Sequence, residues 1–284
     1  MTPFELAEPK SLRKALQLLD TDDPSVRAFG GCTALMQMMK SGVFQPSRLV
    51  SLQRVEKKYS KISLADGVLR IGALATLSSI ASSRAVKKAA PVIIETLRTL
   101  SNVRVRNVAT LGGHLAHGDP HMDLPPLLMA LDAELTAVSV SAARDFALAD
   151  LYTGYYETAL ARNELITEVR VPVTANRRAT YVKCTTRSAD DWPTLGIAVA
   201  LTITGGQVSD PRLVVSAATE KPLRLTRAEA VLRGNVINDG LLARAGEAAA
   251  AEVELMGDAH GSAAYKRELL RVHLARAVRK ALPT

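Results

Sequence analysis

The side chains best suited to chemistry gather in one short segment. Residues 112–123, GGHLAHGDPHMD, contain three of the five histidines and two aspartates: His114, His117, His121, Asp119 and Asp123. Imidazole and carboxylate groups at short spacing are typical ligands of zinc or a non-haem metal. Gly118 and Pro120, however, predict an extended turn instead of a helix that would align an HxxxH pair on one face. A metal-dependent hydrolase built on the three histidines is one interpretation.

Asp123 has two further interpretations. A carboxylate near a glycine turn is a good acceptor for ribityl or ribose hydroxyls, because it takes two hydrogen bonds at once. It also precedes a predicted helix at Leu124 and is a suitable N-cap residue. The two roles are compatible.

Two glycine pairs are the next candidates. Gly30-Gly31 and Gly112-Gly113 each follow an apolar segment that is typical of a strand. A glycine turn lets backbone N–H groups approach a diphosphate closely, although most such turns bind nothing. The sequence contains neither GxGxxG nor GxxxxGK[ST] at these places, so a nucleotide would be held by a fold other than a Rossmann or P-loop domain.

Trp192 is the only tryptophan, and it follows Asp190-Asp191. A single tryptophan usually fills a core or a surface, but near Lys183 and Arg187 this one could lie against an aromatic ring system. No Ser-His-Asp arrangement or nucleophile elbow can be assembled.

The elements that would position these residues follow from apolar spacing and turn signals. Ser11 caps a helix with an apolar face at residues 12, 15, 16 and 19, and Val26–Phe29 is a strand that ends at the first glycine pair. Asp66-Gly67 predicts a hairpin between residues 62–64 and 69–71. The other predicted elements of this half are helices at 84–100 and 124–131, a hairpin of 134–140 with 144–148, and a strand at 165–171.

The polar segment after Pro172, VTANRRAT, predicts a domain boundary near residues 172–178. Beyond it, strands near Tyr181, at 196–203 and at 213–217 precede three helical stretches. The fold class predicted from this order is α+β, in two domains.

Composition limits the class of protein. The chain has 284 residues, of which 48% are hydrophobic and 23% charged, enough for one large or two medium domains. The net charge of +8 is spread along the chain and aromatics make up only 4%, so nucleic-acid binding is not favoured. There is no apolar signal region and no run of 18 apolar residues, which predicts a soluble, cytoplasmic protein without a membrane span. Cys32 and Cys184 stand alone, so any iron–sulfur cluster would belong to a partner.

Several motifs in order resemble one family. They are FGGCTAL-MQMMK, IGALAT, RNVATLGGHLAHGDPHMDLPP, YETALARNELITEVRVP and YVKCTTRSADDW, and they resemble the medium, FAD-binding subunit of the xanthine dehydrogenase and carbon monoxide dehydrogenase family. The resemblance implies a two-lobed FAD-binding domain of the vanillyl-alcohol-oxidase type over residues 1–174, with lobes of about 1–56 and 57–174. It implies a small α+β domain with a three-stranded sheet and helices over residues 178–284.

The resemblance also implies the cofactor site. The first glycine loop and the TxGGN-type loop would surround the FAD diphosphate, Asp123 would bind FAD hydroxyls, and the remaining residues would lie near or cover the flavin ring. The implied cofactor-binding residues are Gly30, Gly31, Cys32, Thr33, Ala34, Thr110, Gly112, Gly113, His114, Asp123, Leu165, Ile166, Lys183 and Trp192. This sequence differs from the family pattern at Cys32, which replaces a glycine, at His114, which replaces asparagine, and at Trp192, which is larger than the usual cover.

The implied function is electron transfer within a molybdenum hydroxylase. A large subunit with a molybdopterin-type cofactor would hydroxylate the substrate, a small subunit with two [2Fe-2S] clusters would relay electrons, and this chain would pass them from FAD to an external acceptor, in a dimer of heterotrimers. Lys183 would favour the reduced flavin through its positive charge. Besides the hydrolase, the other interpretation is an assembly subunit that has lost FAD.

Overall fold

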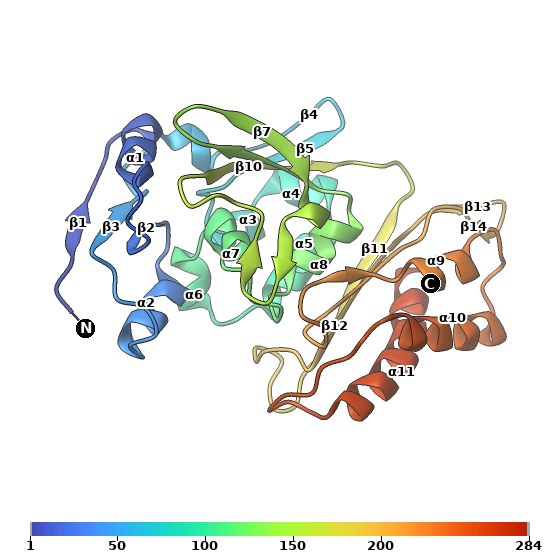
Figure 1. Cartoon of the computed structure of the whole chain (residues 1–284). Coiled ribbons are helices and arrows are strands. Elements are labelled where there is room, and N and C mark those ends of the chain that lie inside the picture. The colour runs from blue at the N-terminus through green and yellow to red at the C-terminus, as the bar shows by residue number, and fades with distance from the viewer. Residues whose placement is uncertain (1, 283–284) are drawn as a thin grey trace.

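The computed structural model describes residues 2–282 and begins with a small lobe at the left of Figure 1. Its three parallel strands lie in the order β1-β3-β2, and Val50 of β3 pairs with both Ala7 and Ala28. The elements are β1 (Glu5–Ala7), α1 (Leu12–Leu19), β2 (Val26–Phe29), α2 (Thr33–Lys40) and β3 (Arg48–Ser51). The helix predicted after Ser11 is α1, and its apolar face closes the core of this lobe.

A five-stranded antiparallel sheet follows, in the order β4-β5-β10-β6-β7. The strands of this sheet are β4 (Ile62–Ala65), β5 (Val68–Gly72), β6 (Glu134–Val138), β7 (Ala143–Ala147) and β10 (Leu165–Pro172). The short helix η1 (Lys57–Ser60) precedes β4, and η2 (Leu148–Asp150) with the separate hairpin β8 (Tyr152–Gly154) and β9 (Glu157–Thr158) lies between β7 and β10. Asp66 and Gly67 have φ values of 51° and 71°, so the predicted β4–β5 hairpin turns where expected. The predicted 134–148 hairpin is β6–β7.

Six helices connect β5 to β6, and the sequence predicts two helices in this region, at 84–100 and 124–131. The helices are α3 (Leu77–Ala81), α4 (Arg84–Ala89), α5 (Pro91–Arg98), α6 (Val103–Val108), α7 (Leu111–Ala116) and α8 (Leu124–Ala130). The single helix predicted at 84–100 is wrong, because the backbone leaves the helical region at Ala90 and Pro91 begins a new helix. The helix predicted at 124–131 is α8.

The C-terminal part contains a four-stranded antiparallel sheet, β11-β12-β15-β16, covered by helices. The elements are β11 (Arg178–Cys184), β12 (Leu195–Leu201), β13 (Ile203–Thr204), β14 (Gln207–Val208), β15 (Arg212–Ser216), β16 (Leu223–Arg224), α9 (Thr226–Leu232), α10 (Asp239–Glu252) and α11 (Ala263–Ala281). The three predicted strands are β11, β12 and β15, and the two-residue β16 is added at the edge. None of the helices within residues 2–282 has the length and apolar character needed to cross a bilayer.

Strand β12 explains how the two parts of the chain fit together. All seven of its residues are buried, because both faces of the sheet are covered. Ala198 and Ala200 face the core of the first part, next to α8, whereas Ile197 and Val199 belong to the C-terminal core on the side of α11. The small side chains on one face let α8 pack closely, so the two parts meet along a continuous apolar interface.

Candidate functional site

The first glycine pair follows β2, as predicted, and leads directly into α2. Cys32 is the N-cap residue of α2 and adopts a left-handed conformation with φ of 58°, which favours glycine. Its side chain makes no capping hydrogen bond. The first turn of α2 therefore presents backbone N–H groups without a side-chain cap, and these groups, with the helix dipole, favour an anion.

The second glycine pair does not follow a strand, so that prediction is wrong. Residues 103–108 form α6, whose N-terminus is fixed by Asn102, and its side chain accepts hydrogen bonds from the N–H groups of Arg104 and Val105. Gly112 and Gly113 then lie in the first turn of α7. Thr110 caps α7, because its Oγ1 accepts from the Gly113 N–H at 3.3 Å.

The two glycine segments touch each other. A Cβ atom built on Gly30 would lie 2.5 Å from Oγ1 of Thr110, and one built on Gly31 would overlap the carbonyl oxygen of Val108. Neither glycine has a positive φ, so both are needed for close packing and not for backbone conformation. The turn before α2 and the turn before α7 thus form a single site.

The two segments do not offer backbone donors equally. In α7 the N–H of Gly112 donates to the carbonyl of Ala73 at 2.7 Å, and that of His114 donates to the carbonyl of Thr110 at 2.9 Å. These backbone donors of α7 are therefore engaged within the chain. The first turn of α2 supplies the uncapped donors, while Gly113 supplies space, since only the Thr110 hydroxyl would meet a Cβ at Gly113.

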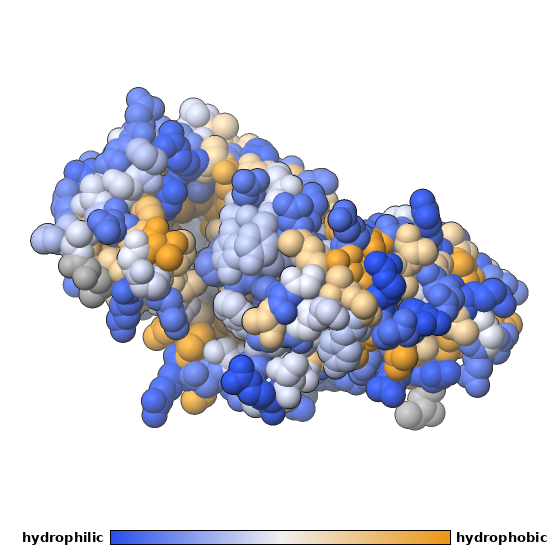
Figure 2. Space-filling model, turned by 60° about the horizontal axis from the view of Figure 1, so that its bottom comes forward, coloured by the Kyte–Doolittle hydropathy of each residue, from blue (hydrophilic) through white to orange (hydrophobic). Residues whose placement is uncertain are grey.

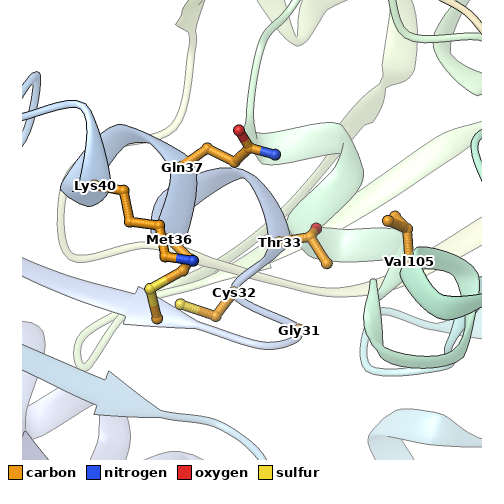
Figure 3. A pocket seen from close by; sticks show the side chains of 7 residues that line it. All are labelled: Gly31, Cys32, Thr33, Met36, Gln37, Lys40 and Val105. Atoms are coloured by element: carbon orange, nitrogen blue, oxygen red, sulfur yellow. The ribbon is translucent and has the colours of Figure 1, made fainter.

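A cavity of about 410 Å³ opens beside this contact (Figure 3). It is lined by Gly31, Cys32, Thr33, Met36, Gln37, Lys40 and Val105. Figure 3 shows Thr33 and Val105 on facing helices, α2 and α6. In Figure 2 the surface is hollowed between the N-terminal lobe and the rest of the molecule, with hydrophobic residues at the rim. Met36, Gln37, Lys40 and Val105 were not predicted as lining residues, and Val105 reaches the cavity only because the fold places α6 opposite α2.

Asp123 lies where α8 begins, between the two parts of the chain. Its Oδ1 accepts a hydrogen bond from the Tyr181 hydroxyl at 2.8 Å, and its Oδ2 accepts one from Nζ of Lys183 at 2.9 Å. Burial raises the pKa of Asp123, and the charge of Lys183 opposes this shift without cancelling it. The predicted N-cap role is wrong, because the Asp123 side chain makes no hydrogen bond to α8.

Lys183 is paired and not a free positive charge. Besides Asp123, its Nζ donates to the carbonyl of Thr99 at 2.9 Å, and its side chain is only 8% exposed. A charge that is neutralised by a buried carboxylate acts weakly on its surroundings.

The three histidines have separate environments. His114 is buried, its Nε2 has no hydrogen-bond partner among the described residues, and burial followed by the charge of His117 lowers its pKa to about 4. His117 packs edge-on against Tyr156, and His121 lies between Asp119 and Asp258. Within residues 2–282 no group of three or more His, Cys, Asp or Glu side chains is arranged to hold a metal ion. The geometry thus gives the metal-dependent hydrolase no ligand set.

The other predicted residues lie in different parts of the chain. Ala34 is half-buried in the first turn of α2, and Leu165, at the start of β10, packs against the core of the N-terminal lobe. Ile166 is buried in the core of the five-stranded sheet. Trp192 lies in the loop between β11 and β12, is 52% exposed, and stacks on His121.

Comparisons with known proteins agree along the whole chain. Residues 2–174 match the family described as the FAD binding domain in molybdopterin dehydrogenase, and residues 180–281 match the CO dehydrogenase flavoprotein C-terminal domain. The glyceraldehyde dehydrogenase medium chain of Sulfolobus acidocaldarius is 31% identical over 95% of each chain. The nicotine 6-hydroxylase medium subunit of Paenarthrobacter nicotinovorans is 33% identical over 96% of this chain and 95% of that one.

The fold agrees as well. The structure of a carbon monoxide dehydrogenase from Hydrogenophaga pseudoflava superposes with a TM-score of 0.94 and 32% identity, covering 99% of this chain and 98% of that chain. The chain has an α+β fold with two adjoining glycine turns, and it matches FAD-binding and flavoprotein domains over nearly its whole length. It therefore belongs to the FAD-binding medium subunits of the molybdenum hydroxylase family.

Proposed function

We propose that this chain is the electron-transferring subunit of a molybdenum hydroxylase complex. It accepts electrons from a small subunit with two [2Fe-2S] clusters and passes them to an external acceptor, while a large subunit with a molybdopterin-type cofactor hydroxylates the substrate. The names of the relatives, medium chain and medium subunit, support a role within a complex. The proposal includes a dimer of two such heterotrimers.

The residues at the two glycine turns fit FAD. The uncapped first turn of α2 is suited to the diphosphate, and the absence of side chains at Gly30 and Gly31 keeps Thr110 and Gly113 within the same site. The buried, unpartnered Nε2 of His114 can form a hydrogen bond with a bound group. FAD, when bound, would supply a carrier that takes up electrons singly from [2Fe-2S] clusters and can release them singly or in pairs.

The remaining residues of the site would surround the sugar chain and the ring. Each oxygen of Asp123 has one donor, so a lone pair on each remains for a ribityl or ribose hydroxyl. Ile166 and Leu165 would border the ring, Lys183 would orient Asp123, and Trp192 would cover the ring from the C-terminal part. The same proposal divides the chain into an FAD-binding domain of 1–174, with lobes of about 1–56 and 57–174, and a C-terminal domain of 178–284.

The observation that carries the proposal is the uncapped α2 terminus next to Gly31, and Thr33→Asp tests it. An acidic residue in the first turn stabilises the helix through the helix dipole, but it repels a diphosphate. We expect Thr33→Asp to unfold at the same or a higher temperature and to lose visible flavin absorption. Thr33→Asn, which has nearly the same shape and no charge, should keep FAD.

Two outcomes would contradict the proposal. Full FAD occupancy in Thr33→Asp would mean that the α2 terminus does not bind the diphosphate. A wild-type complex that binds no flavin after reconstitution would instead identify an assembly subunit without FAD.

A further inference from the structure

His121 and Trp192 form a stacked pair that joins the two parts of the chain. Their ring centroids are 5.3 Å apart and the ring planes differ by 13°. His121 belongs to the segment between α7 and α8, whereas Trp192 belongs to the β11–β12 loop. Since Trp192 is otherwise half-exposed, the His121 ring is a defined contact that fixes the orientation of the indole.

Both nitrogens of the His121 ring face carboxylates. Nδ1 lies 3.0 Å from Oδ1 of Asp119, and Nε2 lies 3.3 Å from Oδ2 of Asp258. An ionised carboxylate only accepts hydrogen bonds, so each ring nitrogen must carry a proton to bond it. The arrangement is therefore that of a positively charged imidazolium, which also interacts favourably with the face of an indole.

The groups around the ring act on this state in different directions, because the positive charge of Lys266 opposes a charged imidazole while Asp119 and Asp258 favour it. On the α11 side, Nζ of the fully buried Lys266 donates to Asp258 at 2.7 Å, and the ring of His260 lies 5.8 Å from that of His121. On the side of the β8–β9 hairpin, burial and the charge of Asp119 raise the pKa of Tyr156, which stays neutral. Burial lowers the pKa of His121, but the hydrogen bonds and charges of Asp119 and Asp258 outweigh burial and raise it above its usual value.

We propose that His121 is a positioning residue: its protonated ring, held between Asp119 and Asp258, fixes Trp192 across the junction of the two parts of the chain and so retains the FAD beneath it. The second half of this proposal rests on the proposed function. When His121 loses a proton, one ring nitrogen faces a carboxylate without a hydrogen between them, and the stacked position is no longer favoured. Loosening of Trp192 with rising pH follows.

The fluorescence of Trp192 tests directly whether protonated His121 fixes the position of the indole, because Trp192 is the only tryptophan of the chain. A protonated imidazole quenches a stacked indole more strongly than a neutral one. In the full chain we expect fluorescence to rise with pH, with a midpoint above about 6.5, the usual histidine value. The titration should occur with and without added FAD, so it is informative even if the chain binds no flavin.

Two variants assign the titration. His121→Gln can still donate to one carboxylate but cannot be protonated, and it should abolish the titration while the chain stays folded by circular dichroism. His260→Gln removes the neighbouring imidazole and should leave the midpoint unchanged. A titration that persists in His121→Gln, or a wild-type chain without one, would overturn the pairing.

The rate of FAD release tests whether the pair of His121 and Trp192 retains the cofactor. We expect His121→Gln to release FAD several-fold faster than the wild type at pH values below the midpoint, with His260→Gln unchanged. Release followed by flavin fluorescence at equal rates in wild type and His121→Gln would overturn the role of the pair at the cofactor site.

Discussion

The pairing of Asp123 with Lys183 changes what a lysine at this position can do. A free ammonium group near a flavin would stabilise its reduced form, but here the charge of Lys183 is balanced by a carboxylate 2.9 Å away. Because burial raises the pKa of Asp123, this carboxyl group takes up a proton readily if the lysine is removed. The site therefore contributes little net charge to its surroundings, whether Lys183 is present or removed.

Lys183→Met should therefore affect stability more than redox potential. Without Lys183, the buried Asp123 either stays charged and uncompensated, which costs about 3–5 kcal/mol, or takes up a proton at a smaller cost. We expect a lower urea midpoint and a nearly unchanged flavin potential. The double variant Asp123→Asn/Lys183→Met should recover part of the lost free energy of unfolding. A markedly lower potential in Lys183→Met would show instead that Lys183 acts as an unbalanced charge.

For single residues, the sequence identifies candidate functional side chains more reliably than it identifies the residues that they contact. Asp123, Thr110 and His114 can be selected from one motif, because chemistry-bearing side chains are rare there. The contact between His121 and Asp258 joins residues 137 positions apart, and no local pattern encodes which loops meet at that distance. Such pairs become visible only when the packing of the two parts is known.

At the scale of elements, the glycine turns show how tertiary structure overrides a local pattern. The alternation of valine with polar residues in VRVRNV favours a strand, yet the Asn102 cap and packing against α3 make it α6. The pattern at 84–100 contains its own stop signal, Pro91, because proline is tolerated at the first position of a helix and breaks a helix interior. Strand–turn–helix at Gly30-Gly31 was predictable because an apolar run, a glycine pair and a helical run follow each other without ambiguity.

Gly31→Ala tests the contact between these two elements. A Cβ at this position would overlap the Val108 carbonyl, so α2 and α6 must move apart, at a cost of about 1–3 kcal/mol. We expect a lower melting temperature together with weaker FAD binding. Gly42→Ala is the matched control: it strains a positive φ at about 1 kcal/mol but meets no neighbouring atom, and it should leave FAD affinity unchanged. Equal FAD affinity in both variants would argue against a shared site.

At the scale of the whole molecule, the two parts of the chain are joined by more than a linker. The two faces of β12 belong to different apolar cores, and Arg177 and Arg212 both bind Asp132, the residue that follows the C-cap of α8. The composition change after Pro172 predicts where the chain passes from one part to the other. It does not predict that the small residues of β12 would extend the first core, because burial on both faces leaves a continuous apolar run without a period.

Two histidines give the stability of the whole chain opposite dependences on pH. The pKa of His114 is about 4 when folded and near 6.5 when unfolded, so only the unfolded chain gains a proton between these values. Stability is therefore lost as pH falls from 6.5 to about 4. His121 has a folded pKa above 6.5, so its contribution is complete below 6.5 and is lost as pH rises through the folded value.

We therefore expect the free energy of unfolding to be greatest near pH 6.5. The acid side should lose about 3 kcal/mol from His114 alone, because folding lowers its pKa from 6.5 to about 4 and each pH unit between them is worth about 1.36 kcal/mol. The lowered pKa values of His117 and His273 act in the same direction. Urea unfolding at a series of pH values measures the curve. His114→Asn should flatten its acid side and His121→Gln its alkaline side, because each removes one titrating group. If the two substitutions changed the same side of the curve, the assignment of opposite pKa shifts to these two histidines would be wrong.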